Sequence, residues 1–192
     1  MMLQDKISKS LREHTAVLEE TFLMQANEMV TFAGQVAEVF NRGGRLLVLG
    51  SGSLGSIANL VANLFRYRLN IERPALPALS LCQDLPLATS LAREGRIGTY
   101  FSQQLQLIAS EGDVVLAFGD VSHNEALLEG LAEARDRGCV TAALLPEKEA
   151  IHGDGPHYLF RLSTDAIGRA AETGLFLGHL LCELVEGELF GI

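Results

Sequence analysis

A short apolar run that ends in alternating glycines and serines constrains this chain more than any other stretch. Residues 43–56 read Gly-Gly-Arg-Leu-Leu-Val-Leu-Gly-Ser-Gly-Ser-Leu-Gly-Ser, and a helical pattern follows over 56–67. The apolar run predicts a buried strand. The glycines allow positive φ and close backbone approach, while the serine hydroxyls and the positive end of the helix dipole favour an anion such as phosphate. The predicted ligand-binding residues of this loop are Gly50, Ser51, Gly52, Ser53 and Ser56.

The same loop permits two other interpretations. Gly50-x-Gly52-x-x-Gly55 matches the dinucleotide fingerprint, which requires an acidic residue about 20 residues further on, at the end of a second strand. Glu72 stands near that distance but precedes Pro74 and the next predicted strand, which disfavours a nucleotide. A tight turn without any ligand would use the same glycines. We therefore expect an anion site and no cofactor.

Charge and composition disfavour several classes of partner. The 192 residues carry 24 acidic and 15 basic side chains, and the net charge of −9 opposes direct binding to nucleic acid or to an anionic membrane. Cys82, Cys139 and Cys182 lie in apolar segments without metal-ligand spacing, so we expect neither a disulfide nor structural zinc. Because no secretory signal pattern and no apolar run of membrane-spanning length occur, we expect a cytoplasmic protein.

Helical and strand-like segments alternate along the chain. Residues 3–41 carry helical periodicity that permits a break near 25–27 and ends at Gly43-Gly44. The predicted strands are 46–49, 78–81, 114–118, 140–145 and 158–162, and the helices between and after them are 56–67, 99–110, 124–137 and 166–189. This order predicts a parallel sheet covered by helices on both faces. The loops after Leu49, Leu81 and Phe118 should then converge on one site.

Three segments resemble the sugar isomerase (SIS) domain family. They are residues 43–53, residues 72–78 (Glu-Arg-Pro-Ala-Leu-Pro-Ala) and residues 111–116 (Glu-Gly-Asp-Val-Val-Leu). The chain is most similar to the branch of phosphoheptose isomerases and DnaA initiator-associating proteins. The resemblance implies an α/β fold, a three-layer αβα sandwich with a five-stranded parallel sheet. It also implies a homotetramer and one domain over 1–192, with a helical oligomerisation segment at 1–42 and an α/β core at 43–192.

The resemblance also indicates where isomerase chemistry has changed. Aldose–ketose isomerisation needs a base beside the carbonyl and an acid or polarising group on the oxygens. The family's glutamate position falls at Leu64 and a nearby family histidine at Leu60, and leucine neither moves a proton nor holds a metal. The last-helix histidine matches His179, with Glu172 two turns before it on about the same face. We expect His179 and Glu172 to be the remaining acid/base candidates, with no metal; a structural histidine at 179 is equally open.

The second phosphate loop of the family is altered as well. Its Ser-Thr-Ser-Gly-Asn-Ser type sequence is replaced by Gly-Asp-Val-Ser-His-Asn over residues 119–124. Two hydroxyls are lost, and the carboxylate of Asp120 opposes a phosphate unless it is protonated or turned away. Ser122, His123 and Asn124 can still donate, although helix capping by Ser122 or Asn124 also explains the segment. The predicted ligand-binding residues here are Asp120, Ser122, His123 and Asn124.

A further polar string, His152-Gly-Asp154-Gly-Pro-His157, contains metal-ligand residue types. A glycine-rich surface turn uses the same residues, and no second ligand run accompanies it. We therefore expect no metal at this string.

Two functions from different classes remain. The favoured one is a phosphosugar-binding, non-catalytic tetrameric scaffold or regulator similar to the DnaA initiator-associating proteins. Its tail resembles theirs, which implies that Leu189 and Phe190 contact a DnaA-type replication initiator; packing of this pair onto the sheet is the alternative. The second function is an active isomerase of sedoheptulose 7-phosphate, with His179, Glu172 or Asp120 in the missing role. Both take a sugar phosphate, and neither contacts nucleic acid or membrane directly.

Overall fold

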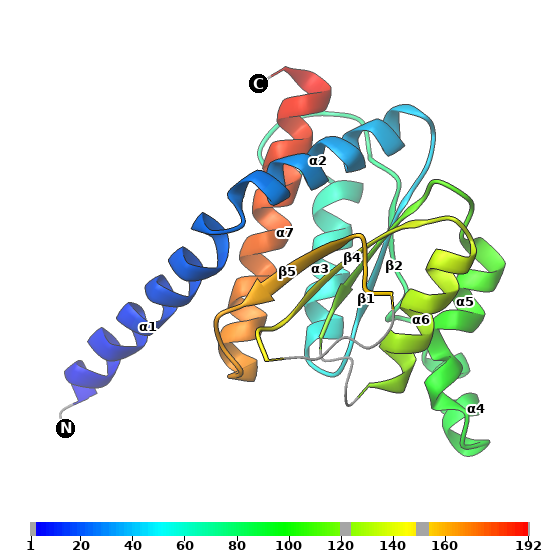
Figure 1. The fold of residues 1–192 in the computed structure, drawn as a ribbon, viewed down its shortest axis with the longest axis horizontal. Coiled ribbons are helices and arrows are strands. Elements are labelled where there is room, and N and C mark those ends of the chain that lie inside the picture. Colours follow the sequence, from blue (N-terminus) through cyan, green and yellow to red (C-terminus); the bar gives the residue numbers. More distant parts are fainter. Residues whose placement is uncertain (1–2, 120–123, 149–153, 192) are drawn as a thin grey trace.

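The computed structural model describes residues 3–119, 124–148 and 154–191. It contains a parallel sheet between two layers of helices, with a long N-terminal helix that extends away from the body (Figure 1). The elements are α1 (Leu3–Leu23), α2 (Ala26–Asn41), β1 (Leu46–Gly50), α3 (Leu54–Arg66), β2 (Ala78–Ser80), α4 (Leu85–Arg93), η1 (Ile97–Thr99), α5 (Tyr100–Ile108), β3 (Val114–Phe118), α6 (Glu125–Asp136), β4 (Val140–Pro146), β5 (Tyr158–Leu162) and α7 (Ile167–Phe190).

The sheet has five parallel strands in the order β2-β1-β3-β4-β5. Alternate side chains of each strand enter different cores, as the two-residue period of a strand requires. Val48 and Leu116 belong to the core cluster with α2, α3 and α7, whereas Leu47 and Val115 belong to the cluster with α4, α5 and α6. Figure 1 shows these two groups of helices on opposite sides of the sheet. The predicted three-layer αβα sandwich is confirmed, because both faces of the sheet are apolar and both are covered.

The N-terminal helical region breaks where the periodicity permits it. The side-chain amide of Gln25 donates to the carbonyls of Thr21 and Arg161, and its Oε1 accepts from the Arg161 backbone N at 2.7 Å. One glutamine side chain therefore joins the end of α1 to the edge strand β5. The chain restarts as α2, whose apolar face packs into the core through Phe32 and Val36.

Helix α4 is an element that the sequence patterns did not predict. It is short and carries Pro86 in its first turn, where proline's missing N–H does no harm. Asp84 caps it, because its carboxylate accepts a hydrogen bond from the Leu87 N at 2.9 Å.

Helix α7 packs closely against α3 because it has glycines at the crossing. A Cβ added at Gly178 would lie 2.3 Å from Val61 Cγ2, and one at Gly174 would lie 3.4 Å from Ile57 Cγ2. A larger residue at position 178 would force the two helices apart. In the part of the chain that the structure describes, no helix is long and apolar enough to cross a membrane.

The Glu-Arg-Pro segment before β2 has a structural role. The Arg73 guanidinium donates to the carbonyls of Leu64 and Phe65 at 2.9 and 2.8 Å, and its Nε lies 2.7 Å from Glu186 Oε1. Both charged side chains are almost fully buried. The Cys182 thiol lies beside this pair, and burial raises its pKa to about 12. Arg73 thus joins the C-terminal end of α3 to the last turns of α7.

Candidate functional site

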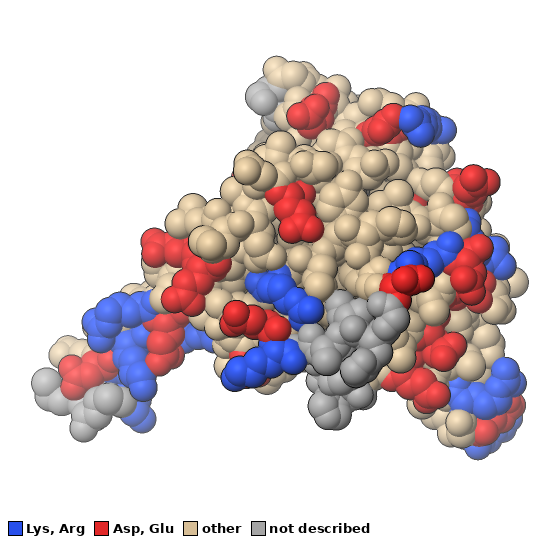
Figure 2. Space-filling view, in the orientation of Figure 1, with Lys and Arg blue, Asp and Glu red and all other residues tan. Residues whose placement is uncertain are grey.

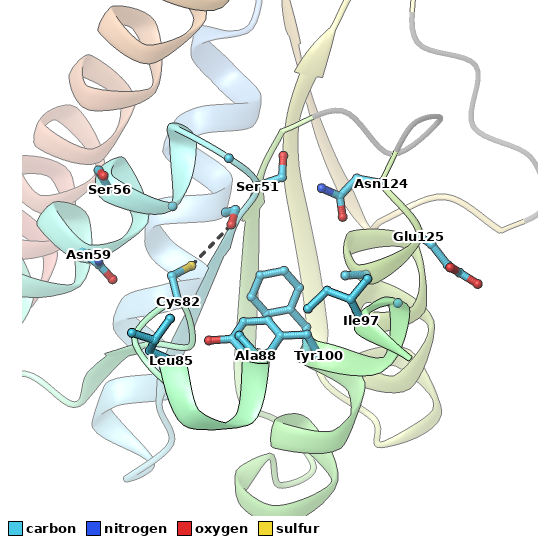
Figure 3. Close-up of a pocket in the computed structure, with 16 residues that line it drawn as sticks. Ser51, Ser56, Asn59, Cys82, Leu85, Ala88, Ile97, Tyr100, Asn124 and Glu125 are labelled. Carbon is cyan, nitrogen blue, oxygen red and sulfur yellow. Dashed lines mark hydrogen bonds between the residues drawn. The ribbon is translucent and has the colours of Figure 1, made fainter. Parts of the chain in front are cut away.

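A cavity of about 620 Å³ lies at the carboxyl ends of β1 and β3, beside the start of α3 (Figure 3). Ser51 follows β1, Cys82 follows β2, and Asn124 precedes α6, so the predicted convergence of three loops is confirmed. The lining residues are Gly50, Ser51, Gly52, Gly55, Ser56, Asn59, Cys82, Leu85, Ala88, Ile97, Gly98, Tyr100, Phe101, Asn124, Glu125 and Ala126.

The glycines of the first loop are required by its geometry. A Cβ on Gly50 would lie 2.5 Å from the carbonyl oxygen of Leu54, which is backbone and cannot swing aside. Gly52 adopts a φ of +52°, a conformation that favours glycine. Gly119, at the end of β3, approaches so closely that a Cβ there would lie 2.4 Å from Ser51 Oγ. The loop is therefore tight, and β1 and β3 are drawn together at its base.

Two amides just before α3 have no hydrogen-bond acceptor in the described structure, and one of them belongs to a residue that lines the cavity. The amides of Leu54, Gly55 and Ser56 donate to the carbonyls three residues before them, at 2.9, 3.2 and 3.1 Å. Within the described residues, the amides of Gly52 and Ser53 have no acceptor. The open donors thus lie in the loop itself, just before the first residue of α3. They coincide with the positive end of the α3 dipole.

The cavity has polar side chains on two opposite sides and an apolar half below Ser51, which includes Leu85, Ala88 and Ile97 (Figure 3). Ser56 and Asn59 stand on one side, Asn124 and Glu125 stand opposite, and Tyr100 lies below them (Figure 3). Glu125 is the one charged side chain among the described lining residues, and lysine, arginine and histidine are absent from that set. An anion here would depend on backbone amides and hydroxyls rather than on a cation.

Cys82 stands between the first loop and the apolar half. Its thiol donates to the Gly50 carbonyl at 3.5 Å, the contact drawn in Figure 3. Burial raises the pKa of this thiol. The thiol is therefore protonated at neutral pH and acts as a weak donor that supports the glycine turn.

The second loop is described at its ends. Asn124 lines the cavity and caps α6, because its Oδ1 accepts from the Leu127 N at 3.0 Å. With its oxygen engaged in the cap, Asn124 can present its amide nitrogen to a ligand. The predicted ligand residues Asp120, Ser122 and His123 lie outside the described residues.

The two acid/base candidates lie on α7 and outside the set of lining residues. The carboxylate of Glu172 accepts from Arg169 at 2.6 Å and lies 2.8 Å from His14 Nδ1 of α1. The Arg169 hydrogen bond, followed by that of His14, lowers the pKa of Glu172. His179 is half-buried and makes no hydrogen bond within the described part of the chain. The structure therefore does not bring Glu172 and His179 together with the loop in this single chain.

Leu60 and Leu64 of α3 differ in exposure. Leu64 is 9% exposed and packs into the core, whereas Leu60 is 40% exposed. Neither lines the cavity. The face of α3 at which the family resemblance implies acid/base residues is therefore apolar.

The remaining polar candidates have structural partners. Glu72 lies 3.0 Å from Arg68 on the surface and does not line the cavity. His157 Nδ1 accepts from the Thr141 N at 3.0 Å, and Asp154 pairs with Arg135. His152 lies outside the described residues. At the tail, Leu189 packs against the core while Phe190 remains 39% exposed.

Sequence patterns missed several lining residues. Asn59 lies one helical turn after Ser56, so its spacing on α3 was a usable signal. Tyr100, Phe101 and Glu125 come from the layer on the other face of the sheet. No local pattern indicates their place, because they lie at the first turns of α5 and α6 and reach the loop only through the packing of these helices on the sheet.

Comparisons with known proteins agree with this geometry. The model of the SIS domain family matches residues 11–145. The phosphoheptose isomerase of Thermodesulfovibrio yellowstonii is 30% identical over 192 residues, which cover 100% of this chain and 96% of that protein. The phosphoheptose isomerase of Solidesulfovibrio magneticus is 32% identical over 188 residues, covering 96% and 91%.

Solved structures share the whole fold. A phosphoheptose isomerase from Francisella tularensis superposes with a TM-score of 0.87 at 24% identity, covering 96% of this chain and 98% of that one. One from Neisseria gonorrhoeae gives 0.84 at 18% identity, covering 97% and 100%. With the parallel sheet, the glycine-serine loop and the whole-length relatives in agreement, the chain belongs to the SIS domain family, in its phosphoheptose isomerase branch.

Proposed function

We propose that this chain binds a sugar phosphate and does not isomerise it. The observation that carries the proposal is the contrast along α3, where an anion-binding loop is followed by Leu60 and Leu64. Enediol chemistry requires a base within hydrogen-bond reach of the substrate carbon. A leucine at either position supplies no such group, and Leu64 is packed into the core.

The first part of the proposal, sugar phosphate binding, depends on the backbone amides of the first loop that have no acceptor. The amides of Gly52 and Ser53 are free of acceptors in the described structure, and the hydroxyls of Ser53 and Ser56 are exposed beside them. Hydrogen bonds to a charged acceptor contribute about 1.5–3 kcal/mol each. Two or three such bonds support phosphate binding without a lysine or an arginine.

A second part of the proposal is that the protein is a scaffold, and it depends on apolar surface that a single chain leaves exposed. The exposed apolar side chains of α1, of its junction with α2 and of α2 are Leu3, Ile7, Leu11, Leu23, Met24 and Val30. On the face shown in Figure 2, charges gather over α1 and near α4 to α6, and the surface over α2 carries few. We infer a homotetramer in which the exposed apolar side chains of α1 (Leu3, Ile7 and Leu11) are buried between chains. Light scattering tests this inference. The substitution Ile7→Asp is expected to reduce the measured mass of the assembly. A monomeric wild-type protein would contradict the inference.

A third part of the proposal concerns the end of α7. Phe190 is exposed although it is a large aromatic residue, and Leu189 lies beside it against the core. The tail resemblance suggests a DnaA-type replication initiator as the partner. Changing Phe190 and Leu189 to alanine should leave the tetramer intact and abolish capture of the initiator. Unchanged capture would rule out this surface.

A second candidate function is an active isomerase. The observation in its favour is that the whole-length relatives named above are phosphoheptose isomerases. His179 is also half-buried without a hydrogen-bond partner in the described structure, although it lies outside the lining of the cavity in this single chain. This function requires another residue to replace the missing glutamate.

Calorimetric titration with sedoheptulose 7-phosphate, combined with a coupled assay for the isomeric aldose phosphate, separates the two candidates. We expect saturable binding with no conversion above the protein-free rate. Conversion that Leu64→Ala leaves intact and His179→Ala abolishes would favour the isomerase. If the protein binds neither sedoheptulose 7-phosphate nor inorganic phosphate, both candidate functions are contradicted.

A further inference from the structure

The side chain of Asn59 has a fixed acceptor and a free donor. It lies on α3 and lines the cavity, where it is half-buried. Its Oδ1 accepts a hydrogen bond from Ser80 Oγ at 2.6 Å. Within the described residues, its amide nitrogen has no partner. A side-chain amide held by its oxygen at a cavity wall is a donor prepared for a ligand.

Ser80 explains why the amide has this orientation. The Ser80 Oγ accepts from the backbone N of Cys82 at 3.3 Å. The single hydroxyl proton then points to Asn59 Oδ1, which is the acceptor within reach. The chain Cys82 N–H to Ser80 O–H to Asn59 Oδ1 therefore assigns the oxygen to β2 and leaves the nitrogen for the cavity.

The position of Asn59 along α3 matches the length of a sugar chain. Ser56, at the phosphate-binding end, precedes Asn59 by three residues, so their Cβ atoms lie about 5–6 Å apart on one face of the helix. In a polyhydroxy phosphate that runs along α3 from the loop, a hydroxyl or carbonyl oxygen two or three carbons from the ester oxygen reaches this distance. Inorganic phosphate does not.

We infer that Asn59 is a specificity-determining residue, which donates a hydrogen bond to an oxygen of the sugar chain and so favours a polyhydroxy phosphate over phosphate alone. The inference rests on the proposed binding function of the same cavity. It assigns the first loop to the phosphate and the Asn59–Ser80 pair to the sugar.

The test measures two ligands on three variants. Sedoheptulose 7-phosphate and inorganic phosphate are titrated into wild type, Asn59→Ala and the matched control Asn63→Ala, which changes an exposed asparagine one turn further along α3 and outside the cavity. Loss of one hydrogen bond weakens sugar phosphate binding about 5- to 10-fold in Asn59→Ala, with phosphate affinity changed less than about twofold. The control should bind both ligands like wild type.

A fourth variant tests the orientation. In Ser80→Ala the Asn59 amide can rotate, so sugar phosphate binding should weaken about 2- to 3-fold and phosphate binding should stay the same. Equal losses for both ligands in Asn59→Ala would mean a general distortion and overturn the inference, as would unchanged sugar phosphate binding. If wild type binds neither ligand, the proposed function itself fails, which is a different result from either of these.

Discussion

The two ends of helix α3 differ in whether their backbone groups have hydrogen-bond partners. At the C-terminal end, the carbonyls of Leu64 and Phe65 accept hydrogen bonds from Arg73, a side chain that is 1% exposed and paired with Glu186. At the N-terminal end, the amides of Gly52 and Ser53, in the loop that leads into the helix, have no acceptor in the described structure, and Gly52 lines the cavity. Every helix leaves unsatisfied backbone groups at both ends. In α3 the C-terminal carbonyls are satisfied by Arg73, and we call this the closed end. The loop amides at the N-terminal end have no acceptor in the described structure, and we call this the open end.

The difference separates stability from binding on a single helix. A buried guanidinium paired with a carboxylate stabilises only when all its partners are present. An open amide pair stabilises nothing until an anion arrives. Between the two ends lie Leu60 and Leu64, which contribute packing and no proton chemistry. Binding to the loop uses mainly the backbone, and that backbone persists even where the side chains needed for catalysis have been replaced.

Breaking the closed end should have the largest effect. In Arg73→Met, the Glu186 carboxylate stays buried without its partner, so we expect the free energy of unfolding to fall by about 3–5 kcal/mol. Urea denaturation measures it. The control is Arg68→Met, which removes an arginine from an exposed pair with Glu72 and should cost less than about 0.5 kcal/mol. Equal effects of the two substitutions would contradict the role assigned to the buried pair.

A substitution in the loop at the open end of α3 should have the next largest effect on the free energy of unfolding. The Cβ of Gly50→Ala would lie 2.5 Å from the Leu54 carbonyl oxygen, so the loop must move. We expect a loss of about 2–3 kcal/mol in unfolding free energy and no measurable phosphate binding. Gly34→Ala is the control, because a Cβ there meets nothing within 4 Å, and it should stabilise the helix by up to about 1 kcal/mol. Normal phosphate affinity in Gly50→Ala would refute the loop as the anion site.

Much of the fold could be predicted from the sequence because its signals are local. The strands at 46–49 and 114–118 are continuous apolar runs, as expected of a sheet buried on both faces. The break near residues 25–27 followed from periodicity. Helix α4 was missed because it is short and contains Pro86, which masks a capped helix start in a single sequence.

The site was less predictable because its parts meet only through the fold. The Gly50 to Ser56 loop was found because its residues are adjacent. Arg73 has its partner 113 residues away at Glu186, and Asn59 has its partner 21 residues away at Ser80. No pattern within one helix or strand shows such pairs.

Two cysteines report on the two ends of α3. Cys82 lies at the open end beside Gly50, and Cys182 lies at the closed end beside Glu186. Burial raises the pKa of both thiols, to about 12 for Cys182, so the reactive thiolate forms only as the pH rises. We expect iodoacetamide at pH 9 to modify Cys82 at least tenfold faster than Cys182, as measured by peptide mass spectrometry. Sedoheptulose 7-phosphate should slow modification of Cys82 alone; equal protection of both would argue against a ligand at the open end.

The smallest effect concerns the contact between α1 and α7 near the open end. Arg169 and His14 lower the pKa of Glu172, so this group stabilises the docked α1 above its ordinary unfolded-state pKa and loses that contribution as the pH falls through the lowered value. Because Glu172 is 44% exposed, solvent screens the pairs. Limited proteolysis between pH 6 and pH 3 should show α1 becoming cleavable as the pH falls through the lowered pKa of Glu172, earlier than the core. In Glu172→Gln this pH dependence should weaken; an unchanged profile would contradict the assignment.

The most direct test of the central claim is solvent deuterium exchange. The pure protein is incubated with sedoheptulose 7-phosphate in heavy water, and the sugar is followed by NMR, because deuterium entering beside the carbonyl reports proton abstraction even when net conversion is slow. We predict ligand-induced shifts of the Gly52 and Ser53 amides and no exchange above that of a His179→Ala control. Exchange in wild type that His179→Ala abolishes would show that the site has recruited a base, and would contradict the account of α3 as a helix that binds without reacting.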